Sequence, residues 1–183
     1  DSGNYITVCA EDDAKCDLQP SGKQCHLYHS YGCYYTRTTG IWQTVWMEFV
    51  SENYIQYIKI DTDINVPSVN INIKTPESSS AYKVSAKAYY DGKLVGEGGT
   101  TVNSWGTFVN FEMSEKHLWE VGVGNLYDLV IELSKDGEVI DTVKSYFGLI
   151  SVALRNGAFV LNDKIVFGRW VLDQGFYPDG IYT

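Results

Sequence analysis

Two Asp-Gly pairs constrain the fold of this chain more than any other feature of its sequence. Asp91-Gly92 and Asp136-Gly137 each lie between two runs of residues that read as strands. Asp-Gly is a strong signal for a β-hairpin because both residues tolerate the positive φ angles of a two-residue turn. At least two hairpins are therefore expected in the middle of the chain.

Further strand-like runs surround these turns. Alternation of apolar and polar residues, or enrichment in β-branched residues, marks residues 55–60, 69–74, 82–90, 105–111, 126–133 and 139–146. No window longer than about ten residues has the apolar period of a helix. We predict an all-β protein, with a sandwich of about seven strands from Tyr54 to Ile150 and a later hairpin, Ala158 to Trp170, that turns at Asn162-Asp163. Trp119 and Tyr127 are expected in the sandwich core.

Charge and hydropathy exclude two classes of partner. The net charge is −9 and no run of Lys or Arg occurs, which argues against nucleic-acid binding. No stretch of 18 apolar residues exists, so no membrane span is predicted. The chain starts without Met and without the features of a signal peptide, so we expect a piece of a longer bacterial protein, in the cytoplasm rather than secreted.

The four cysteines all lie within the first 33 residues, at positions 9, 16, 25 and 33. Three interpretations stay open. Free thiols suit a cytoplasmic protein, two disulfides would need an oxidising compartment, and a zinc site would use Cys16, Cys25, His26 and His29 at spacings that match no standard ligand pattern.

No motif predicts a self-contained active site. His26, His29 and His117 have no identifiable nucleophilic or acidic partner, and no Gly-x-Ser-x-Gly or phosphate-binding loop occurs. The acidic run Glu11-Asp12-Asp13 and the pair Asp61 and Asp63 lack the pattern of a calcium loop and read as solvated faces. No cofactor and no metal are expected.

The densest aromatic segment runs from Tyr35 to Trp46. Trp42, Trp46 and Glu48 would share one face of a strand and could pack into a core. Alternatively, Arg37 and Trp42 lie on a sugar-facing or interdomain surface. The residues alone leave both possibilities open.

Three ordered landmarks resemble family 2 glycoside hydrolases over essentially the whole chain. PSGKQ followed by RTTGIWQTVW resembles the end of the family's sugar-binding jelly roll. NLYDLVIELSKDGEVIDTVKSYFGL resembles its immunoglobulin-like domain, and RNGAFVLNDKIVFGRWVLDQGFYPDGIYT resembles the hairpin and first strand that lead into its TIM barrel. The resemblance implies a jelly-roll part at residues 1–52, an immunoglobulin-like β-sandwich at 53–150 and the start of a barrel at 151–183.

The resemblance also implies a mechanism and a location for it. The family hydrolyses O-glycosidic bonds of β-linked sugars with retention, using two glutamates about 5 Å apart inside the barrel. Glu52, Glu112 and Glu132 lie in or beside strands of the sandwich, so we expect this chain to be a non-catalytic accessory region. Some members carry an acidic cation ligand just before the RTTG run, where this chain has Cys33 and Tyr34, so no metal is expected there.

The partners implied are the carbohydrate substrate of the intact enzyme and its TIM barrel, which this chain lacks. Loops after barrel strands line the active site, so Asp173, Gln174, Tyr177 and Asp179 are candidate substrate contacts in the intact enzyme. Two alternatives remain. One is a stand-alone carbohydrate-binding sandwich with Trp42, Trp46 and Trp105 as a stacking platform, and the other is a structural interaction domain.

Overall fold

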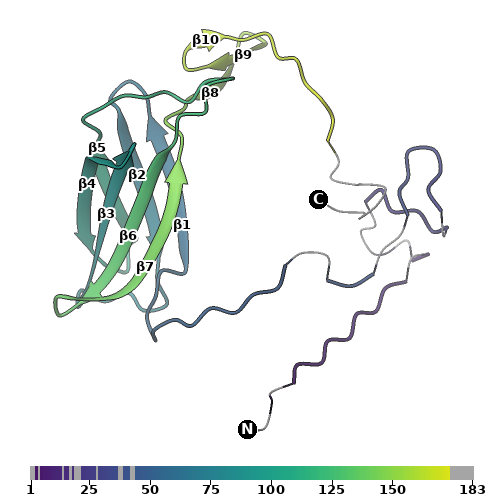
Figure 1. Ribbon diagram of the computed structural model, residues 1–183, viewed down its shortest axis with the longest axis horizontal. Coiled ribbons are helices and arrows are strands. Elements are labelled where there is room, and N and C mark those ends of the chain that lie inside the picture. The colour runs from purple at the N-terminus through teal and green to yellow at the C-terminus, as the bar shows by residue number, and fades with distance from the viewer. Residues whose placement is uncertain are drawn as a thin grey trace. The chain divides into compact units, whose positions relative to one another are not determined.

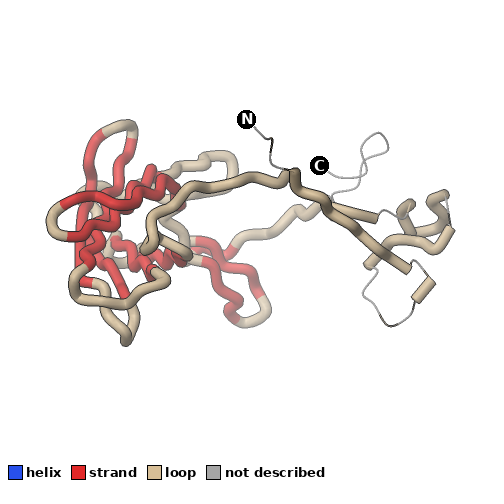
Figure 2. Tube along the Cα trace, turned by 90° about the horizontal axis from the view of Figure 1, so that it is seen from below, coloured by secondary structure: helices blue, strands red, loops and turns tan. Residues whose placement is uncertain are grey.

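The structure is a computed structural model that describes residues 3, 5–13, 15–16, 18, 22–27, 29–36, 39–41 and 44–173. The chain divides into two compact units. The larger unit is Glu48–Gly168, and the smaller one consists of Asp1–Met47 and Arg169–Thr183. The described residues form strands, turns and loops without a helix, which confirms the all-β prediction (Figure 2). Within these ranges no helix has the length and hydropathy needed to cross a membrane.

Ten strands occur in the described residues, all of them in the larger unit. They are β1 (Tyr57–Asp63), β2 (Ser68–Lys74), β3 (Tyr82–Tyr90), β4 (Lys93–Thr101), β5 (Thr107–Glu112), β6 (Tyr127–Lys135), β7 (Glu138–Phe147), β8 (Val152–Arg155), β9 (Ala158–Leu161) and β10 (Lys164–Ile165). All strand pairs are antiparallel.

The first seven strands build a two-layer sandwich. One sheet has the order β1-β2-β5 and the other has the order β4-β3-β6-β7 (Figure 1). The predicted sandwich of about seven strands between Tyr54 and Ile150 is therefore confirmed. The strands β8, β9 and β10 form a separate small sheet in the order β10-β9-β8, at one end of the sandwich.

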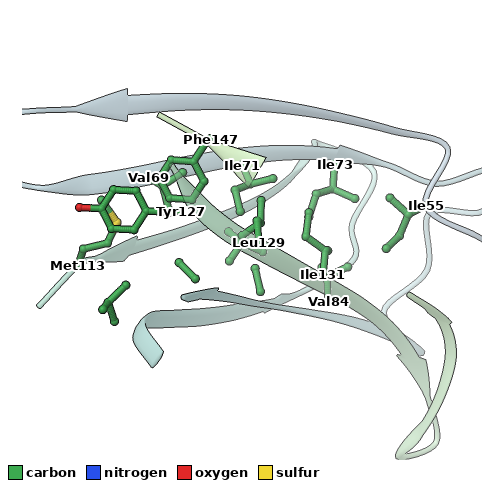
Figure 3. Packing of buried hydrophobic residues seen from close by; sticks show 14 of the residues in the cluster. Ile55, Val69, Ile71, Ile73, Val84, Met113, Tyr127, Leu129, Ile131 and Phe147 are labelled. Atoms are coloured by element: carbon green, nitrogen blue, oxygen red, sulfur yellow. The ribbon is translucent and has the colours of Figure 1, made fainter. Parts of the chain in front are cut away.

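Strict alternation along the strands creates the core between the two layers. In β6, Tyr127, Leu129 and Ile131 are fully buried while the residues between them are not. The opposite sheet contributes Ile71 and Ile73, and the close-up shows both layers meeting in one apolar cluster (Figure 3). Burying one such side chain contributes roughly 1.5–3 kcal/mol.

Aromatic rings close the end of this core. The rings of Tyr127 and Phe147 are stacked, with centroids 5.1 Å apart and planes 9° apart (Figure 3). Tyr127 thus has the core position predicted for it. The prediction for Trp119 is wrong, because its side chain is half-buried outside this cluster and packs instead beside Gly148, where an added Cβ would lie 3.1 Å from the Trp119 Cβ.

Tight turns with positive φ at both central residues join the hairpins. Asp91 and Gly92 have φ of 47° and 77°, and Asp136 and Gly137 have φ of 52° and 86°. These signs match the type I′ turns that Asp-Gly favours. The turn predicted at Asn162-Asp163 joins β9 to β10, but β10 ends at Ile165 rather than near Trp170.

Small residues in β4 let the two sheets approach each other at one edge. A Cβ added at Gly96 would lie 2.8 Å from the backbone oxygen of Glu112, and one added at Gly98 would lie 2.9 Å from that of Asn110. Any side chain at these positions would force β4 and β5 apart. The glycines that weaken β4 as a strand are therefore the residues that let it pack.

The described part of the smaller unit contains isolated bridges instead of strands. Gln24 pairs with Tyr35 and Tyr31 pairs with Tyr34. The thiol of the buried Cys25 donates to the backbone oxygens of Leu27 and His29, at 3.3 and 3.1 Å. A jelly-roll origin for residues 1–52 stays a prediction.

Candidate functional site

The residues predicted to contact substrate fall at the margin of the described chain. Asp173 is exposed and belongs to the smaller unit. Gln174, Tyr177 and Asp179 lie outside the described residues, and so do Arg37 and Trp42. Their roles in substrate or interdomain contact therefore stay predictions.

Two of the three tryptophans of the alternative stacking platform are described. Trp46, in the smaller unit, is 72% exposed. Trp105, in the β4–β5 loop of the larger unit, is 95% exposed, and its backbone N–H donates to Oδ1 of Asn103 at 3.0 Å. Trp105 is therefore held in an open position by a local turn.

The histidine that sequence motifs left without a partner has several. The His117 ring stacks on the Tyr90 ring with centroids 3.8 Å apart and planes 4° apart, and its Nε2 lies 3.0 Å from Oε2 of Glu115. Lys93 also donates to Glu115. Two hydrogen bonds hold the pKa of Glu115 below its ordinary value. The larger effect comes from Lys93 and the smaller from His117.

A buried hydroxyl organises the same loop. Tyr127 Oη accepts a hydrogen bond from the backbone N–H of His117 at 2.7 Å and donates one to the backbone oxygen of Glu115 at 3.0 Å. This arrangement resembles the tyrosine corner of immunoglobulin-type sandwiches, in which a tyrosine near the start of a strand bonds backbone upstream of it. Burial raises the pKa of the Tyr127 phenol. The cluster thus fixes the β5–β6 connection.

An asparagine joins the small sheet to the sandwich. Asn162, in the β9–β10 turn, is only 6% exposed. Its Nδ2 donates to the Trp119 carbonyl at 2.8 Å, and its Oδ1 accepts from the Ser151 N–H at 3.0 Å. The Asn162 N–H also donates to the Ser151 carbonyl at 2.8 Å. One side chain therefore ties the turn to two segments of the chain at the end of the sandwich.

The small sheet presents apolar side chains to solvent beyond this attachment. Four hydrophobic side chains are exposed on β8, on β10 and just after β10. They are Val152 and Leu154 in β8, Ile165 in β10, and Phe167. Clusters of this kind commonly mark contact surfaces with another domain. We call these four residues the apolar surface of the small sheet.

The described residues show no metal-binding constellation. No group of three or more His, Cys, Asp or Glu side chains among them is arranged to hold an ion. Cys9, Cys16, Cys25 and Cys33 are all free, so neither disulfides nor the zinc set is present there.

Sequence reasoning missed the turn that builds the small sheet. Asn156 and Gly157 have φ of 51° and 76° and join β8 to β9. Asn-Gly is the strongest signal for such a turn, so the sequence did carry it. The role of Asn162, in contrast, depends on Trp119, which lies 43 positions earlier in the sequence.

One protein-family model matches the larger unit. Residues 53–149 match the model of glycosyl hydrolases family 2, a span that includes β1 to β7.

Two curated relatives are bacterial glycosidases. Over 144 residues the chain is 26% identical to a β-galactosidase of Oenococcus oeni, covering 70% of this chain and 14% of that protein. Over 109 residues it is 28% identical to a β-glucuronidase of Streptococcus agalactiae, covering 60% of this chain and 17% of that protein. The chain therefore spans less than a fifth of the length of either relative.

The fold also occurs in solved structures. The apo β-glucuronidase of Ruminococcus gnavus aligns with a TM-score of 0.52 and 20% identity, over 63% of this chain and 19% of that one. The same enzyme in complex with D-glucuronic acid aligns equally well. At this level of identity the likeness concerns the fold.

Proposed function

The chain belongs to glycosyl hydrolase family 2, and we propose that it is a non-catalytic accessory region of an enzyme that hydrolyses O-glycosidic bonds of β-linked sugars with retention. The observation that carries this proposal is the position of the family match. It covers the seven-strand sandwich, while the chain corresponds to only 14% and 17% of two glycosidases that it resembles.

The positions of two glutamates in the sandwich strands support a non-catalytic role. Retaining hydrolysis needs an acid/base and a nucleophile about 5 Å apart. Glu112 lies on the outward side of β5 and Glu132 on the outward side of β6, in opposite sheets. Packed sheets are about 10 Å apart, so outward side chains of opposite sheets cannot act on one bond.

The sandwich would act by holding the catalytic barrel of the intact enzyme. The Asn162 contacts fix the small sheet at the end of the sandwich, and the apolar surface of that sheet is open to solvent. We propose that the barrel packs against this surface. Residues 151–183 would then lead directly into the barrel.

The tail would bring side chains to the substrate. In this proposal Asp173, Gln174, Tyr177 and Asp179 lie at the mouth of the barrel and contact the sugar, and Arg37 and Trp42 lie on a sugar-facing or interdomain surface. A carboxylate there accepts hydrogen bonds from sugar hydroxyls, and an aromatic ring covers an apolar sugar face. Asp173→Ala in the intact enzyme would then lower kcat/KM with little change in melting temperature.

The scaffold role is tested by replacing Leu154, which is 80% exposed on β8, with Asp in the intact enzyme. We expect a large fall in activity without loss of stability in the 183-residue chain that carries the same change. Leu94→Asp is the matched control, because Leu94 is an exposed leucine of β4 in the sandwich. Equal activity of both variants would contradict docking on the small sheet.

A further inference from the structure

The outer face of the β1-β2-β5 sheet carries an unusual set of side chains. Residues directly opposite each other in an antiparallel pair lie on the same face, so the pairing defines rows across the sheet. One row joins Asp61, Asn70 and Asn110, and the next joins Asp63, Ser68 and Glu112. On the other side of the first row, Lys59, Asn72 and Phe108 form a third.

This face is hollowed along the strands. A groove of about 730 Å³ is lined by both acidic rows, from Asp61 and Asp63 across to Glu112. A neighbouring hollow of about 390 Å³ includes Asn72, Phe108 and Trp105. Rows on one face are about 7 Å apart along a strand, so the two hollows together offer room for several sugar rings.

The amide side chains at the centre of the face have no partner within the protein. Among the interactions of the described residues, none involves the side-chain amide of Asn70, Asn72 or Asn110. Asn70 and Asn72 are nevertheless half-buried. Asparagine is disfavoured in strands, so three outward asparagines on two adjacent strands weaken the sheet without any compensating bond. Their donors and acceptors are available to a ligand.

Aromatic rings lie at the end of the face away from the acids. Phe108 is 45% exposed on β5, and Trp105 stands open in the loop just before it. The Tyr57 ring is on the same sheet, with Nζ of Lys74 5.5 Å from its centroid. Flat rings beside amides match the two sides of a pyranose, an apolar face and a rim of hydroxyls.

We propose that this face is a binding site for a neutral oligosaccharide, lying along β2 and β5. Each amide offers a donor and an acceptor to neighbouring hydroxyls, and Phe108 and Trp105 stack on sugar rings. Asp63 and Glu112 accept hydroxyl hydrogen bonds and repel carboxylated sugars at their end of the face. Lys59 is paired with Asp61 and Lys74 lies over the Tyr57 ring, so the face has no unshared cationic cluster and the ligand is uncharged. The site lies on the sandwich and is independent of the hydrolytic function proposed above.

Calorimetric titration of the 183-residue chain tests the site. The probes are three neutral hexasaccharides, built from β-1,4-linked glucose, mannose or galactose, and the anionic hexagalacturonate. We expect saturable binding of at least one neutral probe and at least roughly tenfold weaker binding of hexagalacturonate. Asn110→Ala removes a donor and an acceptor and should weaken binding about tenfold.

Two further variants separate binding from folding. Trp105→Ala changes a fully open loop residue and should also weaken binding. Thr142→Ala changes an exposed residue of β7 in the other sheet and should not. No saturable binding of any neutral probe would overturn the proposal. Binding that survives both Asn110→Ala and Trp105→Ala unchanged, or equal affinity for hexagalacturonate, would overturn it too.

Discussion

The side chain of Asn162 donates to the backbone oxygen of Trp119 across 2.8 Å, and this bond connects the small β8–β10 sheet to the end of the sandwich. The same side chain accepts from the Ser151 N–H. Both partners are backbone groups. The Asn162 N–H also donates to the Ser151 carbonyl, and an exposed ion pair joins Lys164 to Glu120, so the Asn162 amide supplies two of several contacts that hold the small sheet.

Asn162→Gly tests this connection. Glycine tolerates the positive φ of 49° at this position, so the change removes the side-chain hydrogen bonds without straining the turn. We expect the free energy of unfolding, measured with urea, to fall by about 1–3 kcal/mol, since two half-buried backbone groups lose their partner.

Asp163→Gly is the control for this change. Asp163 also has a positive φ, of 62°, but it makes an exposed ion pair with Arg155. Such pairs contribute about 0–1 kcal/mol. Equal losses for the two variants would show that turn conformation, and not the Asn162 amide, is responsible.

Tyr127→Phe should destabilise the sandwich while leaving its packing intact. The change removes one oxygen, which bonds the backbone of both His117 and Glu115. We expect a loss of about 1–3 kcal/mol in the free energy of unfolding, because these two groups are left unpaired. Tyr146→Phe, at an exposed tyrosine of β7, should have no measurable effect. An equal free energy of unfolding for the two variants would show that the Tyr127 hydroxyl does not stabilise the sandwich.

Stability should depend on pH through Glu115. Its pKa is held below the usual 4.5 by Lys93 and His117, so the folded state favours the carboxylate. A lowered pKa gives stability that is present above pH 4.5 and is lost as the pH falls through the folded pKa. Wild type should therefore melt above Glu115→Gln at neutral pH, and the gap should close in acid.

Melting temperatures across the acid range, at low salt, measure this gap. Glu138→Gln, at an exposed glutamate at the start of β7, is the control and should show no such closing difference. A gap for Glu115→Gln that stays constant with pH would contradict the ion-pair explanation.

Local turn chemistry made much of the fold predictable. Asp91-Gly92 and Asp136-Gly137 adopt the turns that their types favour, and the alternation of Tyr127, Leu129 and Ile131 identifies the buried face of β6. The run that forms β4 contains three glycines, which disfavour a strand, so its position after the first of these turns was the main sign of a strand. The glycines are explained by the close approach of β4 to β5, a contact that is seen only in the folded structure.

The site was less predictable, because its contacts join distant segments. Asn162 bonds Trp119, and the Asn70 and Asn110 side chains share a row only because β2 pairs with β5. Asp61 and Asp63 read as a solvated face on their own, whereas strand pairing places them beside the asparagines. Register across strands is not visible in one strand at a time.

The central claim is that this chain contributes structure to a family 2 glycosidase without performing catalysis. The most direct measurement is the release of nitrophenol from nitrophenyl β-galactoside and nitrophenyl β-glucuronide by the purified 183-residue chain. We predict no turnover above that of buffer, because paired catalytic glutamates are required for the covalent route. Turnover that co-purifies with the chain and is abolished by Glu112→Gln or Glu132→Gln would contradict the claim.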